Sequence, residues 1–272
     1  MLRLITIPIS HYCEKARWGL ERAGMHYREE PHVQGIHRLA ARRAGGGSTV
    51  PVLVTPEESI GDSGDILRWI DERTPPEQRI YPADPPLRRE AQALCRRFDE
   101  HLGPSGRRLI YVHMLGRPEL SLPFNNQGVP RWEDRLIRSS WPMMVRFMRR
   151  ALGIRPGIEV QDECDAWREL DFVATLLSDG RTHLVGDRFT AADLTFAALS
   201  APLIAPPRYG VPLPQPRDMP APTAALVERA RDHPAGRFAM RMISEHRPDP
   251  LEARGRRMDA ARGTAQMEHS GA

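Results

Sequence analysis

The spacing of apolar and polar residues changes along the chain. The N-terminal part mixes short segments that alternate apolar and polar positions with segments that repeat every three to four residues, which are the periods of strands and helices. The expected strands cover residues 3–9, 27–33, 50–54 and 59–60, and the expected helices cover 12–22, 39–43 and 64–72. The order βαβαββα predicts one small α/β domain.

A proline-rich segment divides the chain after this domain. Prolines at 75, 76, 82, 85 and 86 prevent a continuous helix there. Beyond it the pattern is helical throughout, with expected helices at 87–116, 131–152, 158–179, 190–203 and 221–243. We therefore predict an α/β domain at 1–74, a linker at 75–86, an all-helical domain at 87–245 and a disordered polar tail at 246–272.

Composition narrows the class of protein. Of 272 residues, 40% are hydrophobic and 27% charged, as in a globular protein, and no apolar run reaches the roughly 18 to 20 residues of a membrane span. The N-terminus shows no secretory signal, which predicts a cytoplasmic location. The net charge of +4 is spread among acidic residues, so neither a nucleic acid nor a membrane is expected as a partner.

The three cysteines have no paired spacing. Cys13, Cys95 and Cys164 fit neither a disulfide framework nor a metal site. We expect reduced thiols and no bound metal.

The segment Ser10-His11-Tyr12-Cys13 joins the first expected strand to the first expected helix. Unpaired N–H groups at a helix N-terminus stabilise an anion such as a thiolate by about 0.3–1 kcal/mol. Ser10 suits a helix cap or a hydrogen-bond donor to such an anion. Cys13 suits a small buried residue or a redox thiol, and His11 and Tyr12 suit a pocket wall or an alternative donor.

Two further segments of the α/β domain suit ligand binding. Thr49-Val50-Pro51 opens a strand with a proline, which gives up a ladder hydrogen bond. Asp62-Ser63 precedes the helix at 64–72 and forms a natural cap. Glu58-Ser59 is a rival acid–serine pair, but no helix follows it directly.

A capping box is expected in the helical domain. Thr190 and Asp193 have its spacing, and Phe189 and Leu194 occupy the positions of a hydrophobic staple. This feature is structural rather than catalytic.

Taken in order, these four segments resemble the cytosolic glutathione S-transferase superfamily. Ser-His-Tyr-Cys is similar to the Cys-Pro-Tyr-Cys turn of glutaredoxins with serine first, and to the serine-start turn of zeta, theta and plant-type glutathione transferases. The resemblance implies a thioredoxin-like domain at 1–74 followed by a helical-bundle domain at 87–245 that shapes an acceptor pocket. It also implies a homodimer.

The resemblance implies roles for individual residues. Ser10 takes the catalytic position, with Cys13 and Tyr12 as alternatives. The glutathione-binding positions fall on Thr49, Val50, Pro51, Asp62 and Ser63, with a cis Val50–Pro51 bond, and the acceptor-pocket candidates are Tyr12, Arg107 and Tyr111. Two departures stand out: Thr49 replaces a usual lysine or glutamine, and residues 117–157 have room for an extra helix.

The implied activity is transfer of a small-molecule electrophile to the sulfur of glutathione or a similar small thiol, in a detoxification role and with no metal. Two alternatives stay open. One is a non-catalytic binding or assembly module with the same fold. The other is thiol–disulfide exchange through Cys13.

Overall fold

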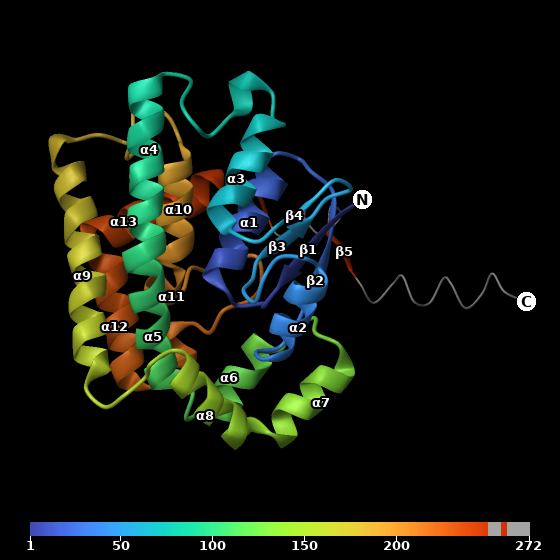
Figure 1. Cartoon of the computed structure of the whole chain (residues 1–272). Helices are drawn as coiled ribbons and strands as arrows, with labels where there is room; N and C mark the ends of the chain where they lie inside the picture. Colours follow the sequence, from blue (N-terminus) through green and yellow to red (C-terminus); the bar gives the residue numbers. More distant parts are fainter. Residues whose placement is uncertain (250–256, 260–272) are drawn as a thin grey trace, which may run out of the picture.

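The computed structural model describes residues 1–249 and 257–259, and Figure 1 shows a small sheet beside a larger group of helices. The strands are β1 (Leu2–Thr6), β2 (Tyr27–Pro31), β3 (Val52–Val54), β4 (Ser59–Ile60) and β5 (Arg257–Asp259), in the order β4-β3-β1-β2-β5. β1 runs parallel to β2 and antiparallel to β3. The mixed sheet and the helices after it confirm the predicted fold class.

The helices of the sheet domain are those that the sequence predicts. They are α1 (His11–Arg22), α2 (Ile36–Arg43) and α3 (Ser63–Glu72). The first crosses from β1 to its parallel neighbour β2. α1 and α3 approach closely because Gly19 has no side chain, and a Cβ there would lie 2.5 Å from a methyl carbon of Leu67.

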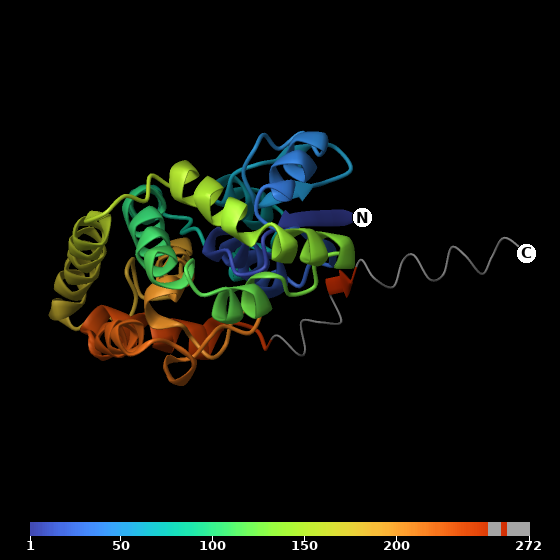
Figure 2. The same ribbon diagram turned by 90° about the horizontal axis from the view of Figure 1, so that it is seen from below.

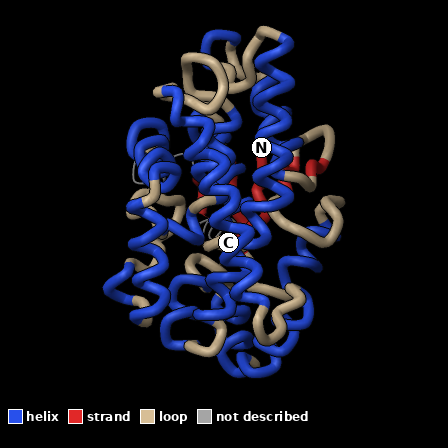
Figure 3. Tube along the Cα trace, turned by 90° about the vertical axis from the view of Figure 1, so that its left-hand side faces the viewer, coloured by secondary structure: helices blue, strands red, loops and turns tan. Residues whose placement is uncertain are grey.

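The larger group contains mostly helices. They are α4 (Pro85–Arg97), α5 (Gly103–Met114), α6 (Pro118–Asn125), α7 (Arg131–Ser139), α8 (Trp141–Ala151), α9 (Ile158–Leu176), α10 (Ala191–Leu199), α11 (Ala201–Ile204), α12 (Ala221–Asp232) and α13 (Pro234–His246). A π-helical turn at Phe98–Leu102 joins α4 to α5, and short 3₁₀ turns lie at Pro76–Gln78, Leu177–Asp179 and Pro216–Asp218. Seen from the helical side in Figure 3, the long helices stand in front of the strands.

The predicted helix 87–116 is α4 and α5 joined by the π-helical turn, and three further predicted helices are each two helices in the structure. The breaks fall before Pro142, Pro202 and Pro234, which stand at the start of α8, α11 and α13. Proline lacks the N–H that a continuous helix needs, but it suits the first turn of a new helix. The region 117–157 therefore holds α6, α7 and α8 instead of one extra helix. In Figure 1 these three helices lie past α2, at the end of the molecule away from α3, and Figure 2 shows this end from below.

The prediction of a disordered tail from residue 246 is wrong for the residues that the structure describes. Arg247 is 2% exposed, and residues 257–259 form β5 on the open edge of β2. The unpaired N–H and C=O groups of an edge strand are a ready template for such pairing. The rest of the predicted tail, 250–256 and 260–272, lies outside the described residues.

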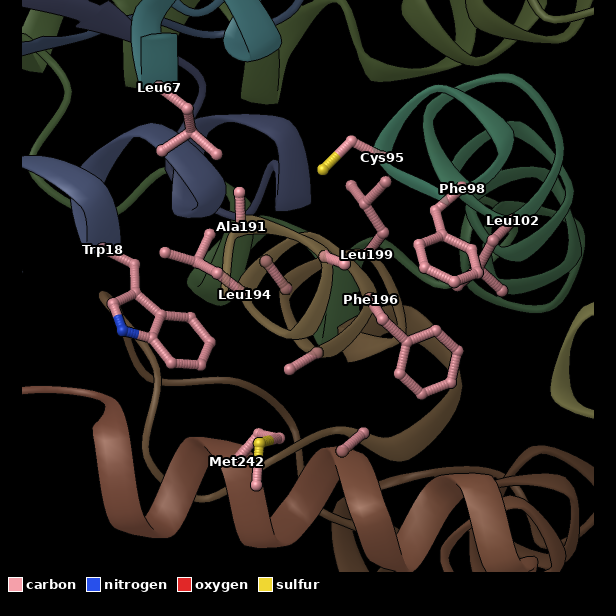
Figure 4. Close-up of a cluster of buried hydrophobic side chains, with 14 of the residues drawn as sticks. Trp18, Leu67, Cys95, Phe98, Leu102, Ala191, Leu194, Phe196, Leu199 and Met242 are labelled. Carbon is pink, nitrogen blue, oxygen red and sulfur yellow. The ribbon is translucent and has the colours of Figure 1, made fainter. Parts of the chain in front are cut away.

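The main core surrounds α10, in which every residue is buried. A helix that is apolar on all sides belongs in the centre of a fold. In Figure 4 its side chains meet those of α1, the α4–α5 segment and α13, represented by Trp18, Phe98 and Met242. One hydrophobic cluster thus joins the sheet domain to the helices, and this fixes the N-terminus of α1 relative to α5.

The predicted capping box is present at the start of α10. The Asp193 carboxylate accepts hydrogen bonds from the Thr190 N–H at 2.7 Å, the Thr190 hydroxyl at 2.8 Å and the Leu184 N–H at 2.8 Å. Asp193 is fully buried, so these donors replace the water that the carboxylate loses.

Candidate functional site

Ser10 is the N-cap of α1, as its position after β1 predicts. Its Oγ accepts a hydrogen bond from the Cys13 N–H at 3.4 Å, and its own N–H donates to the Ile7 carbonyl at 3.1 Å. The side chain is half-buried. Because the oxygen acts as an acceptor toward the helix, the hydroxyl still has a hydrogen to donate, either to the neighbouring Cys13 thiol or to a ligand in the cavity.

Ser10 lies on the wall of a cavity of about 380 Å³. The wall is built from the start of α1, α2, the loop before β3, α5, α6, α8 and the segment from 201 to 223. The predicted site residues that line it are Ser10, Tyr12, Thr49, Val50, Arg107 and Tyr111. The other predicted residues, Cys13, Pro51, Asp62 and Ser63, are not on this wall.

The Val50–Pro51 peptide bond is cis, as expected. Pro51 is buried behind the cavity wall, whereas Thr49 is exposed and Val50 half-buried. The backbone of Val50 therefore stands at the cavity edge next to β3.

Asp62 and Ser63 form the start of α3. The exposed Asp62 is its N-cap, and its Oδ1 accepts from the Gly64 N–H at 2.8 Å and the Asp65 N–H at 3.1 Å. Ser63 is 3% exposed. The structure thus shows the capping role of Asp62, while a ligand role for this pair stays a prediction.

Tyr12 has its hydroxyl occupied. The O–H donates to the Asp99 carbonyl at 2.7 Å. Burial raises the pKa of Tyr12 above its ordinary value, and the carboxylates of Asp99 and Asp62 raise it further, against the opposing charge of Arg107. Gly103 is required here because a Cβ at that position would overlap the Tyr12 hydroxyl. These contacts favour Tyr12 as a wall residue over Tyr12 as a thiol donor.

His11 is a buried neutral group. Burial, and then the charge of Arg107, lower its pKa to about 3. The imidazole is therefore uncharged near neutral pH, and Nε2–H donates to the Gly103 carbonyl at 3.1 Å. Its contact with α5 fixes the start of α1 against the helical domain.

Cys13 points into the core. It is fully buried, and burial raises the pKa of its thiol. A redox cysteine needs an accessible sulfur with thiolate character. Cys13 has neither property, so the alternative of thiol–disulfide exchange is not supported. All three cysteines are free thiols.

Several wall residues escaped the sequence reasoning. His37 and Arg38 come from α2, Asn125 comes from α6, and Trp141 and Phe147 come from α8. The methionines at 143, 144 and 148 favour a core helix over a ligand-binding surface when judged from the sequence alone. No local pattern marks the others, because only the packing of α2, α6 and α8 brings them to the cavity.

Metal-binding clusters and membrane-spanning helices are both absent from the described residues. Within 1–249 and 257–259, no group of three or more histidine, cysteine or carboxylate side chains is placed to hold a metal ion. In the same part of the chain, no helix is long and apolar enough to cross a membrane.

Comparison with known proteins identifies the N-terminal domain. Residues 4–78 match the family model described as glutathione S-transferase, N-terminal domain. No curated protein matches the sequence.

Several solved structures similar to this chain are glutathione transferases. One from Xanthobacter autotrophicus Py2 has a TM-score of 0.59 at 17% identity, covering 93% of this chain and 98% of its own. Glutathione transferase F7 from Populus trichocarpa gives 0.61 at 14% identity, covering 94% and 99%. One from Pseudomonas fluorescens gives 0.57 at 15% identity, covering 90% and 95%. Residues 4–78 thus match the N-terminal domain of the glutathione S-transferases, and the chain as a whole has the fold of these proteins.

Proposed function

We propose that the cavity binds glutathione or a similar small thiol, and that the Ser10 hydroxyl donates a hydrogen bond to the thiol sulfur. The activated sulfur then attacks an electrophilic small molecule. The observation that carries this proposal is the half-buried Ser10 on the cavity wall at the start of α1, with Cys13 N–H bonded to its oxygen.

The hydrogen bond from Ser10 is expected to lower the pKa of the bound thiol by a measurable amount. A hydrogen bond to a charged group contributes about 1.5–3 kcal/mol, and at about 1.4 kcal/mol per unit this lowers a thiol pKa by about one to two units. The positive end of the α1 dipole acts in the same direction. The thiolate fraction at neutral pH therefore rises.

The edge of the cavity near Val50 is suited to the peptide part of the thiol. The Val50 backbone can pair with it as an added strand does. Arg38 lines the same cavity and supplies a positive charge for a carboxylate. His37 is also on the wall, but burial lowers its pKa to about 4, so it is neutral near pH 7. We also propose that Asp62 and Ser63 hold the γ-glutamyl end of glutathione.

The proposal extends to the organisation of the protein. We propose a thiol-binding domain at 1–74, a linker at 75–86 and an acceptor-pocket domain from residue 87. The resemblance to glutathione transferases supports a homodimer, a cytoplasmic location and a role in detoxification.

Calorimetric titration with glutathione, followed by a conjugation assay with 1-chloro-2,4-dinitrobenzene, tests the proposal. We expect Ser10→Ala to bind glutathione nearly as well as the wild type but to lose about tenfold to a hundredfold in turnover. Ser139→Ala, at an exposed site on α7, is the matched control. No binding at millimolar glutathione would contradict the proposal and favour a non-catalytic assembly module.

A further inference from the structure

The charged residues on the cavity wall are all basic. Among the described residues that line it, Arg38 and Arg107 carry charge and no aspartate or glutamate is present. Both neighbouring histidines, His11 and His37, have pKa values lowered by burial and are neutral near pH 7. The cavity wall therefore carries positive charge with no carboxylate on the wall to balance it.

Arg107 has no charged partner among the described residues. Within residues 1–249 and 257–259, its side chain makes no ion pair or hydrogen bond, and its Nε is buried without a partner. The next residue, Arg108, faces α9 instead and binds both carboxylate oxygens of Asp162, with its Nε 3.0 Å from each. The helix thus pairs one arginine with a carboxylate and leaves the other facing the cavity.

The cavity that Arg107 faces is lined mainly by apolar and aromatic side chains. Ile110, Tyr111 and Met114 follow it on the same face of α5, and all three line the cavity. Trp141, Phe147 and Met148 of α8 line the same cavity. A guanidinium that loses water in such surroundings gains most from a charged partner that offers parallel oxygens.

Arg107 and Arg38 lie on different elements. Arg38 is on α2, in the thioredoxin-like half that holds Val50, whereas Arg107 is on α5, in the helical half. Arg107 lies one turn after Gly103 on α5, and the Gly103 carbonyl accepts a hydrogen bond from His11 at the start of α1 at 3.1 Å. Arg107 and Ser10 line the same cavity, so Arg107 is on the α5 side of the place where the proposed function puts the thiol sulfur.

We propose that the acceptor side of the cavity selects electrophiles that join an apolar ring or chain to a carboxylate, and that Arg107 binds this carboxylate. The proposal rests on the proposed function for its chemistry. In the step itself, the thiolate sulfur forms a bond to the electrophilic carbon, and a halide leaves that carbon with the bonding electrons. The thiol proton goes to solvent, and the carboxylate stays bound and unchanged.

A matched pair of electrophiles tests the selection. We compare 4-chloro-3,5-dinitrobenzoate, which carries the carboxylate, with the neutral 1-chloro-2,4-dinitrobenzene, using the wild type, Arg107→Gln and Arg107→Lys. We expect Arg107→Gln to raise the KM for the benzoate about tenfold or more and to change the KM for the neutral compound less than twofold. Arg107→Lys should restore part of the loss. Arg146→Gln, at an exposed site on α8 outside the cavity, is the control for loss of charge.

A compound that can bind but cannot react separates this proposal from the proposed function. Calorimetric titration with 3,5-dinitrobenzoate, which has no leaving halide, measures the anion site alone. Binding that is lost in Arg107→Gln but kept in Arg146→Gln supports the site even if neither electrophile is conjugated, in which case the proposed function fails by itself.

Two results would overturn the proposal. One is that Arg107→Gln raises the KM for both electrophiles equally, or changes the KM for neither. The other is a raised pKa of the bound thiol together with a lower kcat for both compounds, because Arg107 would then act on the sulfur rather than on the acceptor.

Discussion

At the scale of single residues, the start of α1 has a structural role and the chemical role that we propose. Ser10 caps the helix through its oxygen and lies on the cavity wall. Sequence reasoning located this site because strand, turn and helix follow one another along the chain. It could not find Arg38 or Asn125, because these residues reach the cavity only when α2 and α6 pack beside it.

The buried His11 should make the free energy of unfolding depend on pH. Its pKa falls from 6.5 to about 3 on folding, mainly through burial. Below pH 6.5 the unfolded chain binds a proton that the folded chain rejects, so the free energy of unfolding drops as pH falls through this window. Each such histidine contributes about 1.4 kcal/mol per pH unit. We expect His11→Gln to flatten the dependence by roughly this amount between pH 6 and 4, measured by urea unfolding.

The exposed His26→Gln is the control, because its ring has the same access to water in both states. Comparison of variants also removes the contributions of buried carboxylates such as Asp99, whose pKa is raised by burial. An unchanged slope in His11→Gln would contradict the buried, neutral assignment.

At the scale of elements, local sequence signals predicted the beginnings of helices better than their continuity. The capping box of α10 is present as expected. The long helices expected at 131–152 and 221–243 are interrupted, because periodicity continues through Pro142 and Pro234 while the hydrogen-bond ladder does not. The strand β5 could not be predicted, since its partner β2 lies far away in the sequence.

Substitution of Asp193 tests how much the capping box stabilises the protein. Asp193→Ala leaves the N–H groups of Leu184 and Thr190 without their acceptor inside the core, and we expect a loss of about 2–4 kcal/mol in the free energy of unfolding. The exposed Asp187→Ala, in the same loop, should change it by less than about 0.5 kcal/mol. Equal effects of the two changes in chemical unfolding would show that the cap does not stabilise α10.

At the scale of the whole molecule, a buried ionic network joins the two ends of the described chain. Arg247 follows α13, and its Nε lies 2.7 Å from the Glu14 carboxylate on α1, while another of its nitrogens bonds Glu21. Arg17 bonds Glu29 of β2 with 2.7 Å between Nε and Oε1. Sequence reasoning placed Arg247 in a disordered tail because its partners are more than 200 residues away.

Removal of Arg247 should be costly. Arg247→Ala removes the buried arginine that contacts both Glu14 and Glu21, and we expect a loss of about 3–5 kcal/mol in the free energy of unfolding. Arg217→Ala, at a side chain that is 86% exposed, is the control and should have little effect. A similar midpoint of thermal unfolding for wild type and Arg247→Ala would contradict the network.

The central claim is that the Ser10 hydroxyl stabilises a bound thiolate. The most direct measurement follows the ultraviolet absorbance of the glutathione thiolate bound to the protein as pH is varied, in the wild type, Ser10→Ala and Ser10→Thr. The account predicts a thiol pKa about one to two units below that of free glutathione in the wild type, a return toward the free value in Ser10→Ala, and partial retention in Ser10→Thr. The same lowered pKa in wild type and Ser10→Ala would contradict it.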